Sequence, residues 1–174
     1  MPNWCECDLE IEGPSEKVDE FLKFAEGESR FDFNKFAPYP EEYARLDEAA
    51  EVWFYEKKFK TNVDWSTRPT DGFNSGGSDF RIEHWGTKWP ARRVSEVELT
   101  ISYRGREDKG VVIHFDTAWS PPLPVIEKAA ELFPMLSFEL RYFESGAGFN
   151  GLYCCEEGKC VRDECGPYFG NRGG

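Results

Sequence analysis

The strongest constraint on the fold is a strict alternation near the N-terminus, CECDLEIEG at residues 5–13. Its odd-numbered side chains are apolar, namely Cys5, Cys7, Leu9 and Ile11. Its even-numbered side chains are acidic, namely Glu6, Asp8, Glu10 and Glu12. Because successive side chains of a strand point to opposite faces, this pattern predicts a half-buried strand with an acidic outer face.

Two segments have the spacing of helices that bury one face. After the break at residues 13–15, apolar residues recur at i, i+3, i+4 and i+7 (Val18, Phe21, Leu22 and Ala25), and Gly27 suits the end of this helix. A second helix is expected from Ser120 as its cap, with Pro121 at the first helical position. Its buried stripe would be Val125, Ile126, Ala129, Ala130 and Phe133.

The remaining segments are mostly strand-like. We expect strands at residues 30–40, 79–85, 94–105, 110–119, 136–144 and 148–155. GREDKG should connect two of them as a hairpin, and CCEEGKC should form a tight turn between two short strands. Residues 41–59 predict a further helix with a stripe of Tyr43, Leu46, Ala50, Trp53 and Phe54, and residues 68–79 predict a mobile loop.

This order predicts an α+β fold. A βαββαβ arrangement, with two helices on one face of an antiparallel sheet, fits the segments best. We expect one domain at residues 1–152 with an insertion at about residues 40–80. A cysteine-containing hairpin extension at residues 153–174 would follow.

The charge excludes some partners. The chain has a net charge of −12, and residues 1–60 hold 16 acidic residues against 8 basic ones. Such a surface argues against nonspecific binding to nucleic acid phosphates but permits a protein partner. No stretch has the length of a membrane span and no targeting signal is visible, so we expect a cytoplasmic protein without a membrane partner.

Five blocks in order resemble a known family. MPNWC, FDFNKFAPYP, WGTKW, FDTAWSPP with PVIEKAAELFP, and YFESGAGFNG are similar to the YubB ferredoxin-like family, which is encoded largely on plasmids and phages. The resemblance spans residues 1–152 and implies a ferredoxin-like fold, without implying an activity. Two features depart from it: a longer glycine-rich loop at residues 66–79 and the four cysteines of the tail.

Tryptophans in turn-like sequence are the candidate binding site. Trp85, Trp89 and Trp119 could gather at one end of the sheet, with polar groups from Thr87, Lys88, Thr117 and Ser120 around them. Lys88 and the helix start at Ser120 could then meet an anionic group. The alternative is structural: the rings close the core, and Lys88 lies over one of them as a cation–π pair.

Catalysis and metal binding have weaker support. His114 and Asp116 should share a strand face, as a base and its orienting carboxylate would, but no nucleophile is evident, so we do not expect an enzyme. Cys154, Cys155, Cys160 and Cys165 lack the spacing of common zinc sites. We expect no cofactor, with a distorted zinc site as the alternative, and reduced thiols in the cytosol.

Two functions stay open. The first is a noncatalytic accessory or binding protein of a mobile genetic element, acting through the WGTKW and FDTAWSPP loops. The second is an inhibitor whose acidic first strand and helix imitate the phosphates of DNA toward a host enzyme.

Overall fold

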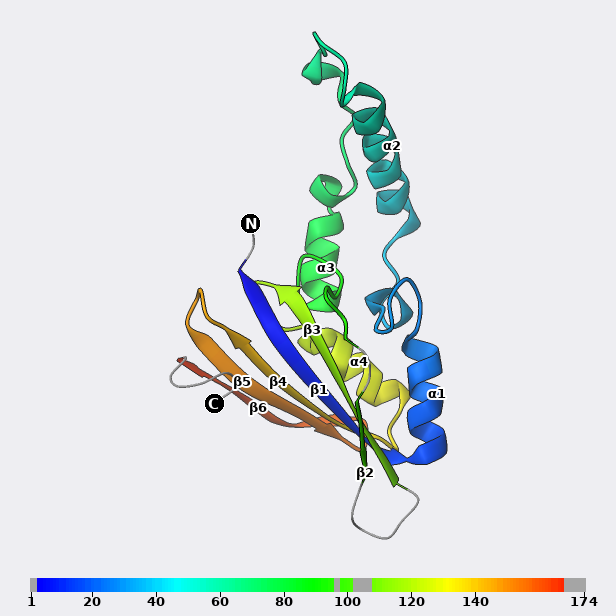
Figure 1. Cartoon of the computed structure of the whole chain (residues 1–174), viewed down its shortest axis with the longest axis vertical. Coiled ribbons are helices and arrows are strands. Elements are labelled where there is room, and N and C mark those ends of the chain that lie inside the picture. Colours follow the sequence, from blue (N-terminus) through cyan, green and yellow to red (C-terminus); the bar gives the residue numbers. More distant parts are fainter. Residues whose placement is uncertain (1–2, 96–97, 102–107, 168–174) are drawn as a thin grey trace.

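The fold is built on one antiparallel sheet. A computed structural model describes residues 3–95, 98–101 and 108–167. The strands are β1 (Trp4–Pro14), β2 (Glu98–Ile101), β3 (Asp108–Ala118), β4 (Ser137–Glu144), β5 (Phe149–Glu156) and β6 (Lys159–Pro167). They lie in the order β2-β3-β1-β4-β5-β6 (Figure 1). The first four strands with their two helices form the predicted ferredoxin-like βαββαβ unit.

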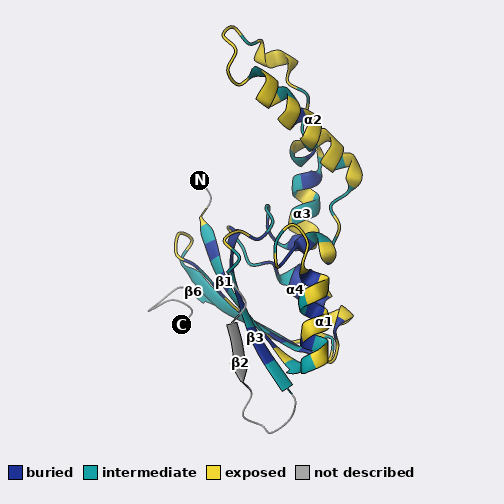
Figure 2. Cartoon of the chain, turned by 45° about the vertical axis from the view of Figure 1, so that its right-hand side comes forward, coloured by how far each residue is buried: buried dark blue, intermediate teal, exposed yellow. Residues whose placement is uncertain are grey.

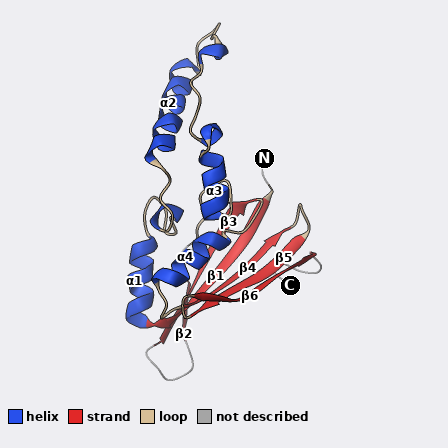
Figure 3. Ribbon diagram, turned by 180° about the vertical axis from the view of Figure 1, so that it is seen from behind, coloured by secondary structure: helices blue, strands red, loops and turns tan. Residues whose placement is uncertain are grey.

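Two helices cover one face of this sheet, as predicted. They are α1 (Ser15–Ala25) and α4 (Leu123–Leu132), and seen from behind they lie in front of the strands (Figure 3). The alternation in β1 behaves as expected, because Cys5, Cys7, Leu9 and Ile11 are fully buried beneath the helices. The acidic side chains of β1 therefore lie on the opposite face, which no described helix covers.

Aromatic rings fill the space between helices and sheet. Phe21 of α1 packs edge-on against Phe133 and Phe138, with centroid distances of 5.3 and 5.4 Å. Phe115 of β3 contacts Phe31 at 5.2 Å. These contacts stabilise the core beyond the burial of their area, because aromatic pairs prefer such tilted geometries.

The strand predicted at residues 30–40 is wrong. The segment is a loop with a short 3₁₀ helix at Phe33–Lys35. The Asp32 carboxylate accepts hydrogen bonds from the backbone N–H groups of Glu28 and Asn34, at 3.1 and 2.9 Å. Because these bonds fold the chain back, Phe31, Phe33 and Phe36 all turn into the core.

The predicted insertion forms an arm that projects from the domain. It contains α2 (Glu41–Lys57), short 3₁₀ turns at Trp65–Thr67 and Phe73–Ser75, and α3 (Gly77–Trp85). The helix predicted at residues 41–59 is confirmed, but its apolar stripe is not a core face. Only Ala50 of that stripe is buried, and most of α2 has the colour of exposed residues in Figure 2.

The strand predicted at residues 79–85 is also wrong, because α3 occupies them. Gly76 and Gly86, with φ of +121° and +76°, flank this helix. Phe80 and His84, four residues apart, stack at 4.4 Å, a contact that helical spacing permits and a strand does not. The loop predicted at residues 68–79 is accordingly interrupted by the 3₁₀ turn and by the first residues of α3.

The C-terminal hairpin continues the sheet. β5 and β6 pair across a two-residue turn, Glu157-Gly158, as CCEEGKC predicts. β5 runs through residues 152 and 153, so the extension and the domain share this strand. In the GREDKG connection, residues 105–107 lie outside the described residues and residues 108–110 belong to β3. The last seven residues of the chain also lie outside them. None of the described helices has both the length and the apolar content needed to cross a bilayer.

Candidate functional site

Three indole rings form a row at one end of the sheet. Trp4 and Trp89 have ring centroids 6.1 Å apart, and Trp89 and Trp119 have centroids 5.4 Å apart. The rings come from the start of β1, the turn after α3 and the end of β3. They meet because β1 pairs antiparallel with β3, which places Trp4 opposite Ala118. We call Trp4, Trp89 and Trp119 the indole row.

Buried hydrogen bonds connect the two loops that carry the row. The Thr87 hydroxyl donates to the Ala118 carbonyl at 2.9 Å and accepts from the Ala118 N–H at 3.1 Å. The Ser120 hydroxyl donates to the Gly86 carbonyl at 2.6 Å. The two tryptophan-containing segments therefore converge at one end of the fold, as the sequence suggests.

Cations flank the row. The Lys88 ammonium lies 5.1 Å from the centre of the Trp119 ring, and the Arg93 guanidinium lies 5.4 Å from that of Trp4. A cavity of about 450 Å³ is lined by Trp4, Trp89, Arg92 and Arg93. The site thus offers aromatic faces and positive charge together, on a chain whose net charge is −12.

Two residues of this region have a left-handed backbone conformation, which residues other than glycine rarely adopt. The φ of Trp119 is +66° and that of Arg93 is +51°. The Trp119 N–H is held by the Asn3 carbonyl at 3.0 Å, and Arg92 exchanges two backbone hydrogen bonds with Asp116. The fold therefore imposes this backbone beside the cavity, and such strain gathers at functional sites.

The other predicted site residues have structural positions. Trp85 is 1% exposed, and its indole N–H donates to the Ala37 carbonyl at 2.8 Å. Thr87 and Thr117 are buried, and the Thr117 hydroxyl donates to the Ser120 carbonyl at 2.8 Å. The geometry divides the predicted set: Trp85 closes the core, whereas Trp89 and Trp119 reach the surface. The Lys88–Trp119 cation–π pair is the contact named in the structural alternative.

The predicted helix start at Ser120 is wrong. α4 begins at Leu123, with Pro122 before it, and the Ser120 hydroxyl is used by Gly86. A residue that precedes proline is disfavoured in helical conformation, so the Pro121-Pro122 sequence delays the first turn. The predicted anion site, formed by Lys88 and a helix N-terminus at Ser120, is therefore not present at Ser120.

Sequence reasoning missed Trp4, Arg92 and Arg93 as site residues. The βαββαβ order itself contained a signal for Trp4, because this topology pairs the start of the first strand with the end of the third. The arginines gave no such signal, since the Arg92–Asp116 bridge forms outside the regular strands.

His114 and Asp116 each contact another residue. Both residues lie on the open face of β3, but the His114 Nδ1 contacts the Asp8 carboxylate at 2.5 Å. Asp116 forms an ion pair with Arg93 at 3.2 Å. The two residues share a strand face, as predicted, and the contact shown for the imidazole is with Asp8.

The four C-terminal cysteines do not converge. Cys155 is buried toward the helices, whereas Cys160 and Cys165 are exposed on β6, and all six thiols of the chain are free. Cys155 and Cys160 are direct partners across the hairpin. Within residues 3–95, 98–101 and 108–167, no three His, Cys, Asp or Glu side chains gather as metal ligands would.

Comparisons with known proteins agree with the fold. Residues 98–168 match the family model described as a ferredoxin-like domain in Api92-like protein. The crystal structure of the protein Api92 from Yersinia pseudotuberculosis is similar over 98% of this chain and 99% of that one. The TM-score is 0.54 and the sequence identity is 14%. No curated protein matches the chain. The chain therefore has a ferredoxin-like α+β fold.

Proposed function

We propose that the chain is a noncatalytic binding protein of a mobile genetic element, a cytoplasmic relative of the YubB proteins, and that it captures a protein partner through the indole row. The observation that carries this proposal is the row itself, with its adjoining cavity and flanking cations. Tryptophan and arginine are the residues that most often dominate binding energy at protein interfaces. Trp119 keeps 40% of its surface exposed.

The chemistry of the row favours an extended segment with acidic residues. Carboxylates of such a segment could pair with Arg92 and Lys88, while its apolar side chains or prolines cover the rings. The acidic open face of the sheet would repel an acidic segment that binds there instead of at the indole row. Binding should depend more on ring contact than on charge, and should therefore tolerate salt.

The test is affinity capture from a host lysate at about 0.1 and 0.5 M salt, two conditions that differ roughly twofold in screening length. The wild-type chain and the Trp89→Ala and Trp119→Ala variants serve as bait. Trp65→Ala, which removes an exposed indole of the arm, is the matched control. We expect the same partner at both salt concentrations with wild type and Trp65→Ala, and its loss with the two row variants. Equal capture by folded Trp119→Ala protein would refute the role of the row.

One observation favours a second candidate, a mimic of DNA phosphates. Burial raises the pKa of Glu10, and the neighbouring carboxylates Glu12 and Glu139 raise it further. Like charges thus lie close together on the open sheet face, as they do along a phosphate backbone. A mimic predicts the opposite salt dependence, because capture would fall sharply at 0.5 M salt. It would also be lost in Glu10→Gln/Glu12→Gln protein and kept in Trp119→Ala.

A further inference from the structure

The end of the arm presents a group of exposed aromatic side chains. Phe59 is 88% exposed just beyond the end of α2, Tyr55 is 60% exposed and Trp65 is 57% exposed. Single exposed rings are common on protein surfaces, but three large ones at the end of one projection mark a contact surface. This set, Tyr55, Phe59 and Trp65, is called the knob.

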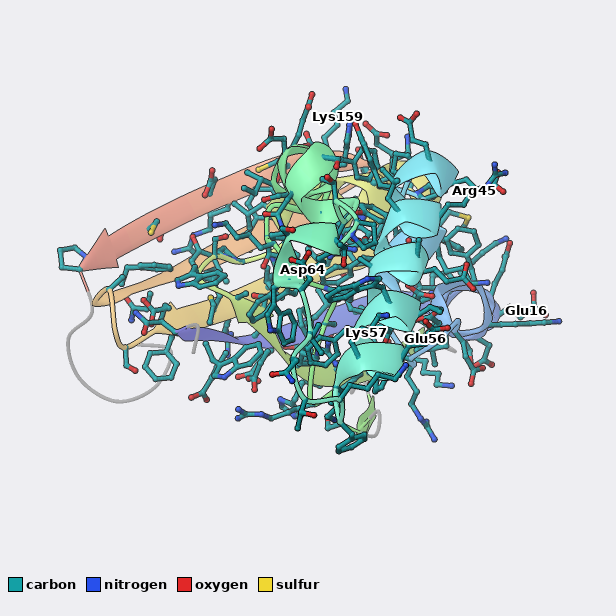
Figure 4. All side chains as sticks on the ribbon, turned by 90° about the horizontal axis from the view of Figure 1, so that it is seen from above. Glu16, Arg45, Glu56, Lys57, Asp64 and Lys159 are labelled. Atoms are coloured by element: carbon teal, nitrogen blue, oxygen red, sulfur yellow. The ribbon has the colours of Figure 1, made fainter. Side chains whose placement is uncertain are left out.

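The knob is positively charged on an acidic protein. Residues 57–68 contain Lys57, Lys58, Lys60 and Arg68 against one acid, Asp64. In the described part of the chain none of the three lysines has an ion-pair partner, and the Lys58 ammonium lies 5.5 Å from the centre of the Phe59 ring. Figure 4 looks down on this end of the arm, with Lys57 on α2 and Asp64 on the returning loop.

The opposite end of the molecule carries an apolar socket. A cavity of about 220 Å³ lies between α1 and the α4–β4 connection. It is lined by Lys17, Glu20, Leu132, Phe133, Pro134, Met135 and Leu136. Leu132 and Met135 keep 46% and 62% of their surface exposed, so the apolar lining is open to a partner.

Socket and knob are complementary in size and in charge. A cavity of roughly 150 Å³ already accepts a benzene molecule, so the socket can take the ring of Phe59. Four carboxylates lie on the socket's lining or beside it, against the two lysines Lys17 and Lys128. Glu20 lines the cavity, Glu131 precedes Leu132, Glu12 is the strand partner of Ser137, and Glu16 acts on Lys17. Lys17 pairs with Glu20 and Lys128 pairs with Glu131, so Glu12 and Glu16 give the region its negative charge.

We propose that the knob of one chain docks into the socket of a second copy of the same chain. The two surfaces lie at opposite ends of the long axis (Figure 1), so one chain cannot satisfy both. A contact between two different surfaces is heterologous, and it produces rings when the rotation closes and open chains when it does not. Assembly through this contact leaves the indole row uncovered.

Sedimentation velocity of the full-length protein tests the proposal, from about 10 μM to 1 mM, the range over which weak contacts of this kind assemble. Wild type should form dimers and larger species as the concentration rises. Phe59→Asp replaces the most exposed ring of the knob by a carboxylate, and Met135→Lys places a positive charge in the apolar lining of the socket. Each variant alone should self-associate at least ~10-fold more weakly than wild type. Val161→Asp, at an exposed apolar residue of β6, is the matched control and should assemble like wild type.

Mixing the two defective variants gives the sharpest result. Phe59→Asp protein keeps its socket and Met135→Lys protein keeps its knob, so an equimolar mixture should form a two-chain species and nothing larger. The proposal is overturned by wild type that stays monomeric at 1 mM, or by wild-type assembly that neither variant weakens. It is equally overturned by a mixture in which no two-chain species forms.

Discussion

The Thr87 hydroxyl makes two hydrogen bonds to the backbone of Ala118, donating to its carbonyl and accepting from its N–H. Thr87 is 1% exposed, so water does not compete for either bond. Together with the hydrogen bond from the Ser120 hydroxyl to the Gly86 carbonyl, this side chain fixes the turn after α3 to the end of β3. It thereby sets the distance between Trp89 and Trp119, the two rings that these segments carry.

Replacing Thr87 by valine should therefore be strongly destabilising. The substitution keeps the shape of the side chain but leaves the Ala118 N–H without this acceptor in a buried place, which should lower the free energy of unfolding by about 2–4 kcal/mol. Urea unfolding followed by circular dichroism measures this change. Thr67→Val is the control, because the Thr67 hydroxyl bonds to the Asp64 carbonyl at the surface and its loss should cost under about 0.5 kcal/mol. Equal losses in the two variants would contradict the role assigned to Thr87.

Glu10 should make the folded protein less stable as the pH rises through the acidic range. Burial and the carboxylates of Glu12 and Glu139 raise its pKa in the folded state, so the folded chain binds this proton more tightly than the unfolded chain. Stability then falls as the pH rises from the unfolded pKa of about 4.3 through the higher folded value.

Glu10→Gln should accordingly be more stable than wild type at pH 7. We expect a gain below about 1 kcal/mol, because the sheet face is partly solvated, and no gain below about pH 4, where Glu10 is protonated in both states. Urea unfolding of both proteins from pH 3.5 to 8 measures this gain as a function of pH. The gain should appear over about one to two pH units above the unfolded pKa. Glu48→Gln, at an exposed position of α2, is the matched control.

Most of the sheet and the two covering helices could be predicted because their periodicity and their burial agree. Cys5 to Ile11 and Val125 to Ala130 each point one apolar face at the same core. The errors lie where a local contact overrides the pattern. Phe31 and Phe33 alternate like a strand, but the Asp32 carboxylate satisfies the backbone there instead of a neighbouring strand.

The candidate site was predictable only in part. Convergence of the two tryptophan loops follows from the order of the strands, but burial does not follow from residue type. Trp85 and Trp119 come from similar turn-like sequence, and one is 1% exposed while the other is 40% exposed. Trp85 packs against Phe33 and donates to the Ala37 carbonyl, whereas the Trp119 ring lies beside Trp89 at the surface, so three-dimensional contacts rather than composition decide the difference.

The six thiols should separate into reactive and protected groups. Burial raises the pKa of Cys7 well above its ordinary value and that of Cys155 to about 11, so few of these groups are thiolates at pH 8. Cys160 and Cys165 are exposed on β6. An aromatic disulfide reagent should therefore modify two thiols quickly in the folded protein, and Cys160→Ser/Cys165→Ser should abolish the fast phase. Rapid modification of all six in folded protein would contradict this burial.

The β5–β6 turn offers a stabilising substitution. Glu157 and Gly158 both have positive φ, +50° and +77°, which is the pattern of a type I′ hairpin turn. Asparagine tolerates this backbone better than glutamate does, so Glu157→Asn should raise the free energy of unfolding by about 0.5–1 kcal/mol. Thermal and urea unfolding measure the gain. Glu156→Asn, one residue earlier and inside β5, should give no gain, because asparagine is disfavoured in strands. If both variants behaved alike, the left-handed backbone at Glu157 would not be the source of strain.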